Sequence, residues 1–264
     1  MLNKMQLAIL KKDIQSAASS KRMISALIVV PIMMAVVMPV IFISIILFTP
    51  EDSPDMIELL RILPYTSLQG ADMRNTLIEM ILNYVIPVFF VLIPIMASSV
   101  MASSSFVGEK EKKTLETLLY CPLPLKDIFN AKILASFFLS MAVSVSSFIT
   151  MIIAIEMYLF IAEGIFYLPN INWLIMMLLV SPAAALISIN LIVRGSAKSQ
   201  TSEEAQQSSL FLITPVILLI VGQFTGIMMI SSGIFLILGA VLAVIAVITL
   251  KGSYSKFNYE TLLK

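Results

Sequence analysis

The charged residues with the most informative spacing lie in one segment, residues 107–122, whose sequence is VGEKEKKTLETLLYCP. The segment begins as a charged elbow and continues as a short amphipathic helix. Leu115, Leu118 and Leu119 share one face of that helix, and Pro122 ends it. Leucines exposed to water in this way indicate a partner surface, so the segment is predicted to dock onto another protein. A basic flank that is amphipathic and binds nothing explains the same residues, and the pattern alone does not decide between the two.

Other residue types exclude most catalytic and metal chemistry. The chain has no histidine and a single cysteine, Cys121, which excludes His-ligated metal sites, Ser-His-Asp or Cys-His nucleophiles and an internal disulfide. Residues 195–199 (GSAKS) resemble the end of a phosphate-binding loop but lack its first glycine and its spacing. We therefore expect no cofactor and no metal in this chain. The net charge of +1 argues against nucleic acid as a partner.

The elements that position the segment are those of a membrane protein. Hydrophobic residues make up 59% of the 264 residues, charged residues make up 12%, and the mean hydropathy is +1.00. A soluble domain has about 45–50% apolar and about 25% charged residues, so much of this apolar surface must face lipid. The expected fold class is an all-α membrane protein in which residues 1–264 form a single transmembrane domain.

Six apolar blocks are long enough to cross a bilayer, which takes about 20 residues at about 1.5 Å each. The predicted transmembrane helices are residues 24–48, 84–106, 133–155, 171–193, 208–224 and 232–250. The first block is too long for the apolar core of a cleaved signal peptide, so we interpret it as a retained span. Pro87, Pro94, Pro182 and Pro215 lie inside predicted spans and can kink them.

Lysine and arginine set the expected orientation. With the amino terminus in the cytoplasm, 15 of the 17 Lys and Arg residues are cytoplasmic, Lys132 among them, and only Arg61 and Arg74 lie outside. Both termini are then cytoplasmic. Residues 50–83 form an outer loop, and residues 107–127 form the cytoplasmic loop that carries the amphipathic helix between the second and third spans.

Residues 1–22 are predicted to form an interfacial helix that lies in the membrane surface. Leu7, Leu10, Ile14 and Ala17 recur at helical spacing and make its apolar face, while its lysines face anionic lipid. An ordinary solvated leader is the alternative.

The predicted spans contain no Asp, Glu, Lys or Arg. Ion-coupled carriers and pumps keep ionisable groups at membrane depth, so these spans offer no proton relay. Small residues recur instead: Ser136, Ser140, Ser144 and Ser147 share one face of the third span, and Gly239 begins a similar stripe in the sixth. Such stripes let helices approach closely, and a weakly polar path or a dimer seam is the alternative.

The segment 107–122 resembles the signature of the ATP-binding-cassette type 2 exporter permeases, whose pattern is roughly G-E-x-E-x-x-T-L-E-x-L-L-x-x-P. The residues that match this pattern in place are Gly108, Glu109, Glu111, Thr114, Leu115, Glu116, Leu118, Leu119 and Pro122. Residues 204–206 (EAQ), in a polar loop before the fifth span, and the terminal residues 257–263 resemble two further segments of the family. Lys113 stands where many members have glycine, and Tyr259 stands where arginine is usual.

The resemblance implies a function and a set of partners. The amphipathic helix would be a coupling helix that seats on a separate cytoplasmic ATPase, which would bind ATP and magnesium. The docking residues would be Leu115, Leu118 and Leu119, and the residues at the ATPase rim would be Glu109, Glu111 and Glu116. A second permease copy, identical or paralogous, would complete an exporter in a bacterial or archaeal cell membrane.

The charge-free spans favour an amphipathic or hydrophobic cargo, such as a peptide or a drug, over a bare ion. Sodium export by the same family and a non-transporting immunity or scaffold protein that sequesters a peptide are the alternatives. A membrane enzyme would need a nucleophile with an activating group at membrane depth, and the spans hold serines but no residue that could activate one.

Overall fold

The structure, a computed structural model, describes residues 4–50, 53, 73–114, 124–164, 166–167, 169–196, 198–224 and 232–254. All regular secondary structure within these residues is helical. Six of the described helices are long and apolar enough to cross a membrane: Met23–Phe48, Leu77–Glu111, Leu125–Glu163, Ile171–Gly195, Ser202–Gln223 and Ser232–Lys251. The predicted all-α fold is confirmed for these residues, and six helices match the number of spans predicted. The cytoplasmic placement of both termini stays a prediction.

Several spans are assembled from consecutive helical pieces. The first span and its approach consist of α1 (Lys4–Ser19), α2 (Lys21–Ile32), η1 (Met33–Val37) and α3 (Met38–Phe48). The second consists of α5 (Met73–Met80), η2 (Ile81–Val85), α6 (Ile86–Phe90) and α7 (Leu92–Glu111), and the third is α9 (Leu125–Glu163). The fourth span consists of α10 (Ile171–Ile175), η3 (Met176–Val180) and α11 (Ser181–Gly195). The fifth consists of α12 (Ser202–Gln207) and α13 (Leu210–Phe224), and the sixth is α14 (Ser232–Tyr254).

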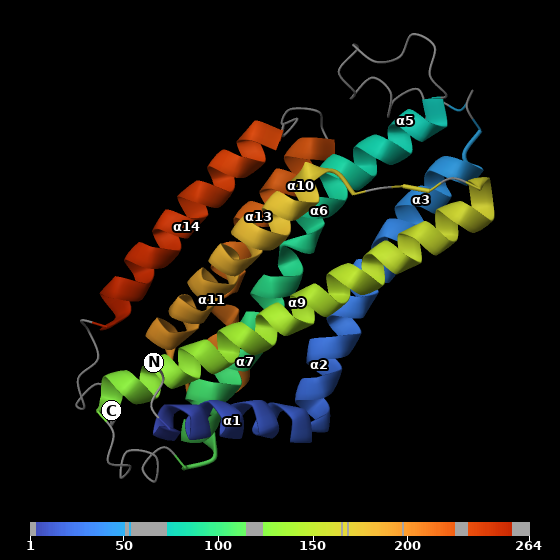
Figure 1. The fold of residues 1–264 in the computed structure, drawn as a ribbon. Coiled ribbons are helices and arrows are strands. Elements are labelled where there is room, and N and C mark those ends of the chain that lie inside the picture. Colours follow the sequence, from blue (N-terminus) through green and yellow to red (C-terminus); the bar gives the residue numbers. More distant parts are fainter. Residues whose placement is uncertain are drawn as a thin grey trace.

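The spans run alongside one another, and α1 lies across one end of the bundle (Figure 1). We call this end the α1 end. There α7 and α14 finish and α9 begins (Figure 1). Helix α1 packs against α9 and α2, and α7 packs against α9, α11 and α12. The α1 end therefore brings together helix ends from distant parts of the sequence.

Each of the three π-helical turns described ends two residues before a proline: Pro39 follows η1, Pro87 follows η2 and Pro182 follows η3. Proline lacks a backbone N–H, and its ring collides with the carbonyl four residues earlier, so the preceding turn widens. The irregularities predicted at Pro87 and Pro182 take this form. Pro39 adds one that was not predicted.

The widened turn in the second span frees backbone carbonyls, and the fourth span caps them. Pro87 has no N–H for the carbonyl of Asn83, and Asn172 Nδ2 donates to that oxygen instead, at 3.0 Å. Trp173 Nε1 donates to the carbonyl of Leu82 at 3.1 Å. Both donor residues belong to α10 and both are buried. Because unsatisfied backbone groups are costly in hydrocarbon, these bonds hold the second and fourth spans together.

Helix α9 is a single element of 39 residues without proline or glycine. Its length of about 58 Å exceeds a hydrocarbon core of about 30 Å. It begins after Pro124, carries Asp127 in its first turn and ends at Gly164, whose φ of 68° is left-handed. The predicted third span, residues 133–155, lies inside it. The extra length brings the first turns of α9 to the α1 end.

The serines on the small face of the third span are all buried: Ser136, Ser140 and Ser144 are 0% exposed and Ser147 is 3% exposed. Ser140 and Ser144 each donate to a carbonyl of their own helix at 2.9 Å. Helix α7 packs along α9. Ser136 Oγ has no hydrogen-bond partner among the described residues, so the choice between helix packing and a weakly polar path stays a prediction.

The sixth span meets the fourth closely at Gly239. A Cβ atom on this glycine would lie 2.7 Å from Leu179 Cδ2 and 3.1 Å from Val180 Cγ2. Ala246, two turns further along α14, is 1% exposed and packs in a buried cluster with Ala183. The close approach predicted for this stripe of small residues is therefore present.

We expect Gly239→Leu to destabilise the folded protein by about 1–3 kcal/mol, because the new side chain would overlap Leu179 and overpack the contact. The measurement is thermal unfolding of the purified protein in a mild detergent. Ala240→Leu is the matched control, since Ala240 is exposed on the same helix. Equal destabilisation by both substitutions would contradict a tight contact at Gly239.

Candidate functional site

The acidic segment singled out in the sequence begins in the last turn of α7. Gly108 and Glu109 are buried there, Glu111 is the final helical residue, and Thr114 follows. The backbone N–H and the Oγ1 of Thr114 both donate to the carbonyl of Glu109, at 2.9 and 3.3 Å. The predicted site residues outside the described residues are Leu115, Glu116, Leu118, Leu119 and Pro122. The structure thus describes where this segment leaves α7 and where the chain returns, at Pro124.

Helix α7 is closed by a left-handed residue, Lys113, whose φ is 57°. The N–H of Lys113 donates to the carbonyl of Lys110, and the N–H of Lys112 donates to that of Gly108, both at 3.0 Å. A side chain in this conformation costs about 1 kcal/mol relative to glycine. The left-handed conformation is one that suits the glycine which the resemblance places at this position, and Lys113 keeps the turn.

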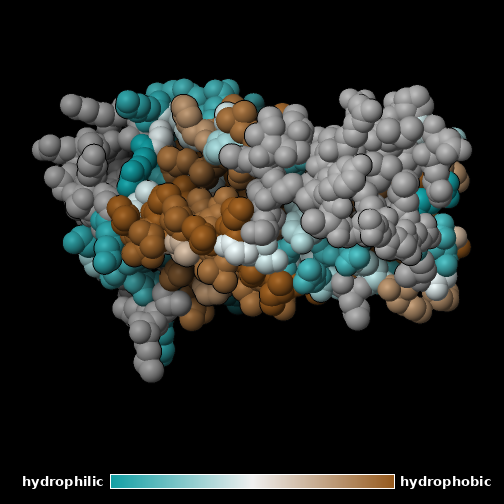
Figure 2. Space-filling view, turned by 90° about the horizontal axis from the view of Figure 1, so that it is seen from above, coloured by the Kyte–Doolittle hydropathy of each residue, from teal (hydrophilic) through white to brown (hydrophobic). Residues whose placement is uncertain are grey.

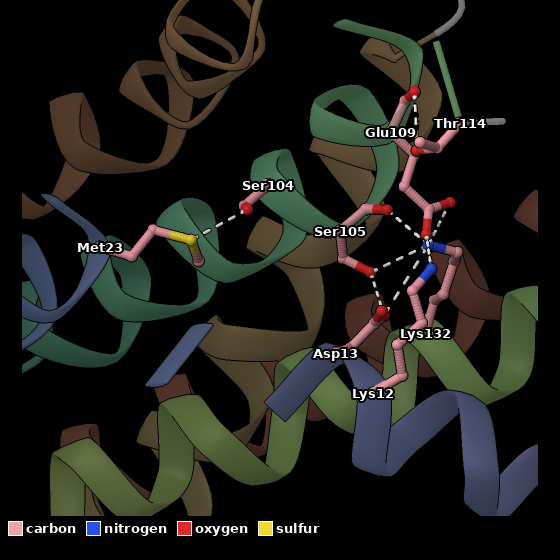
Figure 3. A network of polar contacts seen from close by, with 8 residues as sticks. All are labelled: Lys12, Asp13, Met23, Ser104, Ser105, Glu109, Thr114 and Lys132. Carbon is pink, nitrogen blue, oxygen red and sulfur yellow. Dashed lines mark hydrogen bonds and ion pairs between the residues drawn. The ribbon is translucent and has the colours of Figure 1, made fainter. Parts of the chain in front are cut away.

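Glu109 belongs to a buried ionic cluster that joins α1, α7 and α9 (Figure 3). Lys132 Nζ of α9 lies 2.8 Å from Glu109 Oε2 of α7 and 3.8 Å from Asp13 Oδ2 of α1. Ser105 of α7 donates to Asp13 Oδ2 at 2.6 Å, and its carbonyl accepts a 2.5 Å hydrogen bond from Lys132. Lys12 Nζ of α1 lies 2.6 Å from Glu109 Oε1. We call these five residues the ionic cluster.

Three charged side chains of the ionic cluster are buried, whereas the side chain of Lys12 is 54% exposed and contacts the cluster from the surface. Lys132 is 3% exposed, and Asp13 and Glu109 are each 7% exposed. Burial of a charge is costly unless counter-charges and hydrogen bonds satisfy it, and here two ammonium groups face two carboxylates. The ring of Phe106, 5.6 Å from Lys132 Nζ, adds a cation–π contact. Loss of one charge would leave the others uncompensated, so the cluster holds three helices in one arrangement.

Glu109 is the one member of the ionic cluster that was predicted as a site residue. The sequence indicated Lys132 only as one of the cytoplasmic lysines, whereas the structure buries this residue at the centre of the cluster. Asp13 carries a signal that was missed, because it lies four residues after Ile9 and four before Ala17, both of which are buried. Leu7, on the predicted apolar face of α1, is 54% exposed, and the placement of this face against lipid stays a prediction.

Glu111 contacts a different helix, α12. Its Oε2 accepts hydrogen bonds from the N–H and the Oγ of Ser202, at 3.2 and 3.0 Å, at the first residue of α12. A carboxylate at a helix amino terminus satisfies N–H groups that have no partner within the helix. Gly108 also lies beside α12, since a Cβ atom on it would be in van der Waals contact with Ser202 Oγ at 3.4 Å. Residues 204–206 lie within α12, so their predicted placement in a loop is wrong.

The carboxylate of Glu204 helps to cap the amino terminus of α12, the helix to which it belongs. Its Oε2 accepts from the N–H of Gln200 at 2.7 Å, while its N–H donates to Thr201 Oγ1 at 3.2 Å, a reciprocal cap. The end of α7 is therefore connected through Glu109 to α1 and α9, and through Glu111 to α12. The described residues contain no group of three or more acidic or cysteine side chains that could hold a metal ion.

Comparison with known proteins gives one result for this chain. The model of a family described as ABC-2 family transporter protein matches residues 7–230. A search of curated proteins and a search of solved structures each find no match. The resemblance inferred from residues 107–122 is confirmed by the family match.

We expect Lys132→Met to destabilise the protein by about 3–5 kcal/mol, because it leaves the carboxylates of Asp13 and Glu109 buried with fewer counter-charges. Thermal unfolding in detergent measures the loss. Combining the change with Asp13→Asn and Glu109→Gln should restore most of the stability, since no buried charge then lacks a partner.

The matched control for this prediction is Lys126→Met, because Lys126 is exposed on the same helix. It should leave the unfolding temperature nearly unchanged. A Lys132→Met protein as stable as this control would show that the ionic cluster does not hold α1, α7 and α9 together.

Proposed function

Because the chain belongs to the ABC-2 family of transporter proteins, we propose that it is the membrane permease subunit of an ATP-driven exporter. Its six apolar helices make it a multi-pass membrane protein. In this proposal a separate ABC ATPase subunit binds ATP and magnesium in the cytoplasm, and the permease has no enzymatic activity of its own. The proposed location is the cell membrane of a bacterium or an archaeon.

The observation that carries the proposal is the way the end of α7 is tied to its neighbours. Thr114 is bonded to the carbonyl of Glu109, and the chain re-enters α9 at Pro124, whose carbonyl accepts from the N–H of Asp127 at 2.9 Å. A load on residues 115–123 would therefore reach α1 and α9 through Glu109, and α12 through Glu111. This connection supports a loop that passes the movement of a docked ATPase to the first, third and fifth spans.

The predicted contact residues divide into two groups in this proposal. Leu115, Leu118 and Leu119 insert into a groove of the ATPase, and Glu116 contacts its rim. Glu109 is buried inside the permease, so we assign it to transmission within the chain instead of the rim. The partners that complete the exporter are an ABC ATPase subunit and a second permease copy, either identical or paralogous.

The proposed cargo is an amphipathic or hydrophobic molecule, such as a peptide or a drug, moved out of the cell. The charged residues of the ionic cluster lie at the α1 end, and the stretches predicted to cross the lipid carry none. A bare sodium ion would need many oxygen ligands or charged groups along such a path. The composition of the spans therefore supports an apolar or amphipathic cargo.

We expect the double change Leu118→Asp with Leu119→Asp to remove at least about 90% of the ATPase subunit that co-purifies with the tagged permease. Two carboxylates on the docking face would have to be buried without counter-charges. Membrane insertion and thermal stability of the permease should stay as in the unaltered protein, because the ionic cluster is not touched. Cargo-stimulated ATP hydrolysis in liposomes should fall with the loss of the ATPase.

The control is Glu203→Ala with Glu204→Ala, which removes charges from α12 and the local cap of Glu204. This change should weaken ATPase association less than the leucine changes do. If it proves the more damaging of the two, the main contact lies at α12. If no ABC ATPase ever associates with the unaltered permease, the proposed function is wrong.

A further inference from the structure

A cavity of about 170 Å³ lies among the second, fourth, fifth and sixth spans. Its lining residues come from α6 and α7, from η3 and α11, from α13, and from α14. Every side chain that lines it is apolar, with Val88, Met176, Ala184, Val216 and Phe235 representing the helices that contribute. It lies apart from the ionic cluster, whose residues belong to other parts of the chain. None of the functions argued above uses this cavity.

The cavity is closed toward the protein and open beside α13. Val88 and Met176 are each 2% exposed and Phe235 is 1% exposed, whereas Pro215 of α13 lines the cavity and is exposed. The outer face of α13 presents Phe211, which is 80% exposed, as expected for a surface in lipid. Figure 2 shows hydrophobic side chains gathered on the side where Figure 1 draws α13 and α14. The bilayer is therefore the phase from which a ligand would enter.

The size and lining of the cavity define what can occupy it. A water molecule needs two to four polar partners, and the lining side chains offer none. A buried cavity of about 150 Å³ lined by apolar side chains in another protein stays dry and binds benzene. The cavity described here is of that size, so a single aromatic ring or an equally small apolar group fits it.

A second observation is a buried acceptor one helical turn away from the cavity lining. Gln223 lies one turn beyond Leu219, a lining residue of α13, and Tyr84 lies one turn before Val88 on the facing helix. Gln223 Nε2 donates to the carbonyl of Tyr84 at 3.0 Å, which leaves its Oε1 as an acceptor. This Oε1 is buried and has no hydrogen-bond partner among the described residues, and Gln223 is 6% exposed. A buried acceptor without a donor is unfavourable by about 1–3 kcal/mol, which a ligand with one donor could relieve.

We propose that this cavity is a binding site for ring-sized apolar molecules that carry one hydrogen-bond donor and dissolve in the bilayer. The class comprises small phenols, aromatic alcohols and aromatic amines. The ring occupies the apolar cavity, and the hydroxyl or amino group donates to Gln223 Oε1. Binding requires only the permease, so failure of this proposal would leave the proposed export function untouched.

The experiment is photolabelling of the purified permease in liposomes with an aryl diazirine that carries a benzyl alcohol group. Labelled residues are located by mass spectrometry, with and without excess unlabelled benzyl alcohol. We expect the competitor to remove most labelling at Met176 and Phe235, which line the cavity. Labelling at the lipid-exposed Phe211 should not change, because partition into lipid does not saturate. Labelling at Met176 and Phe235 that the competitor leaves unchanged would overturn the proposal.

Two substitutions test the cavity itself. Val216→Phe fills it from the half-buried wall on α13, and Ala184→Leu fills it from the buried wall on α11. Each should abolish the displaceable labelling at Met176. Ala142→Phe, on an exposed face of α9, is the matched control and should leave that labelling as it is. If either filled variant that retains the unaltered unfolding temperature also retains displaceable labelling, the ligand is not in the cavity.

Gln223→Met tests the polar contact. It should raise the concentration of benzyl alcohol that displaces half of the label about three- to tenfold, the range expected for one hydrogen bond. Displacement by toluene, which fits the cavity but has no donor, should not change. An equal effect on both competitors, or none on either, would exclude Gln223 as the acceptor and overturn the proposed ligand class.

Discussion

The arrangement of the α1 end depends on one buried ammonium group placed between two carboxylates. Lys132 satisfies Glu109 and Asp13 at once, and Ser105 completes the contacts of both Asp13 and Lys132. Apolar side chains of similar volume would hold three helices together at least as strongly, but they would tolerate sliding. Charges and directed hydrogen bonds allow few alternative positions. We interpret the ionic cluster as the element that fixes where α1 lies relative to the last turn of α7.

The second span is held by different forces at its two ends. At the α1 end its contacts are ionic, whereas at the opposite end they are hydrogen bonds to carbonyls that Pro87 and the π turn set free. The donors at that end, Asn172 and Trp173, lie next to each other on α10. The same proline that breaks the regular bonding of one helix thus supplies the acceptors that fasten it to another.

The sequence allowed the spans to be found because a lipid-crossing helix leaves a signal averaged over about 20 residues. The small stripe at Gly239 and the family signature beginning at Gly108 were also visible, since each depends on local spacing. Lys132 was not recognised because its partners come from other helices; Ser105, for example, lies 27 residues earlier, on α7. The residue count behind the positive-inside rule gives the side of the membrane and says nothing of burial.

Other differences have similar causes. Residues 204–206 looked like a loop because they are polar, yet Thr201 and Glu204 cap a helix there and Ala205 is fully buried. Asp13 was not recognised as a site residue, because its partner Lys132 lies on α9, far from α1 in the sequence. The cavity beside α13 could not be predicted at all, since it arises from how side chains of four spans fail to fill one volume.

Helix α9 is one continuous helix over its whole length, so its two ends are mechanically connected. With no proline or glycine between Leu125 and Glu163, it lacks the residues at which helices kink most often. From Lys132 to Glu156 it extends about 36 Å, so a tilt of about 5° about one end would carry the other through about 3 Å. Near that far end Tyr158 shares a 2.6 Å hydrogen bond with Ser44 of α3. A small tilt of α9 at the ionic cluster would therefore move the residues near its far end, where α9 contacts α3.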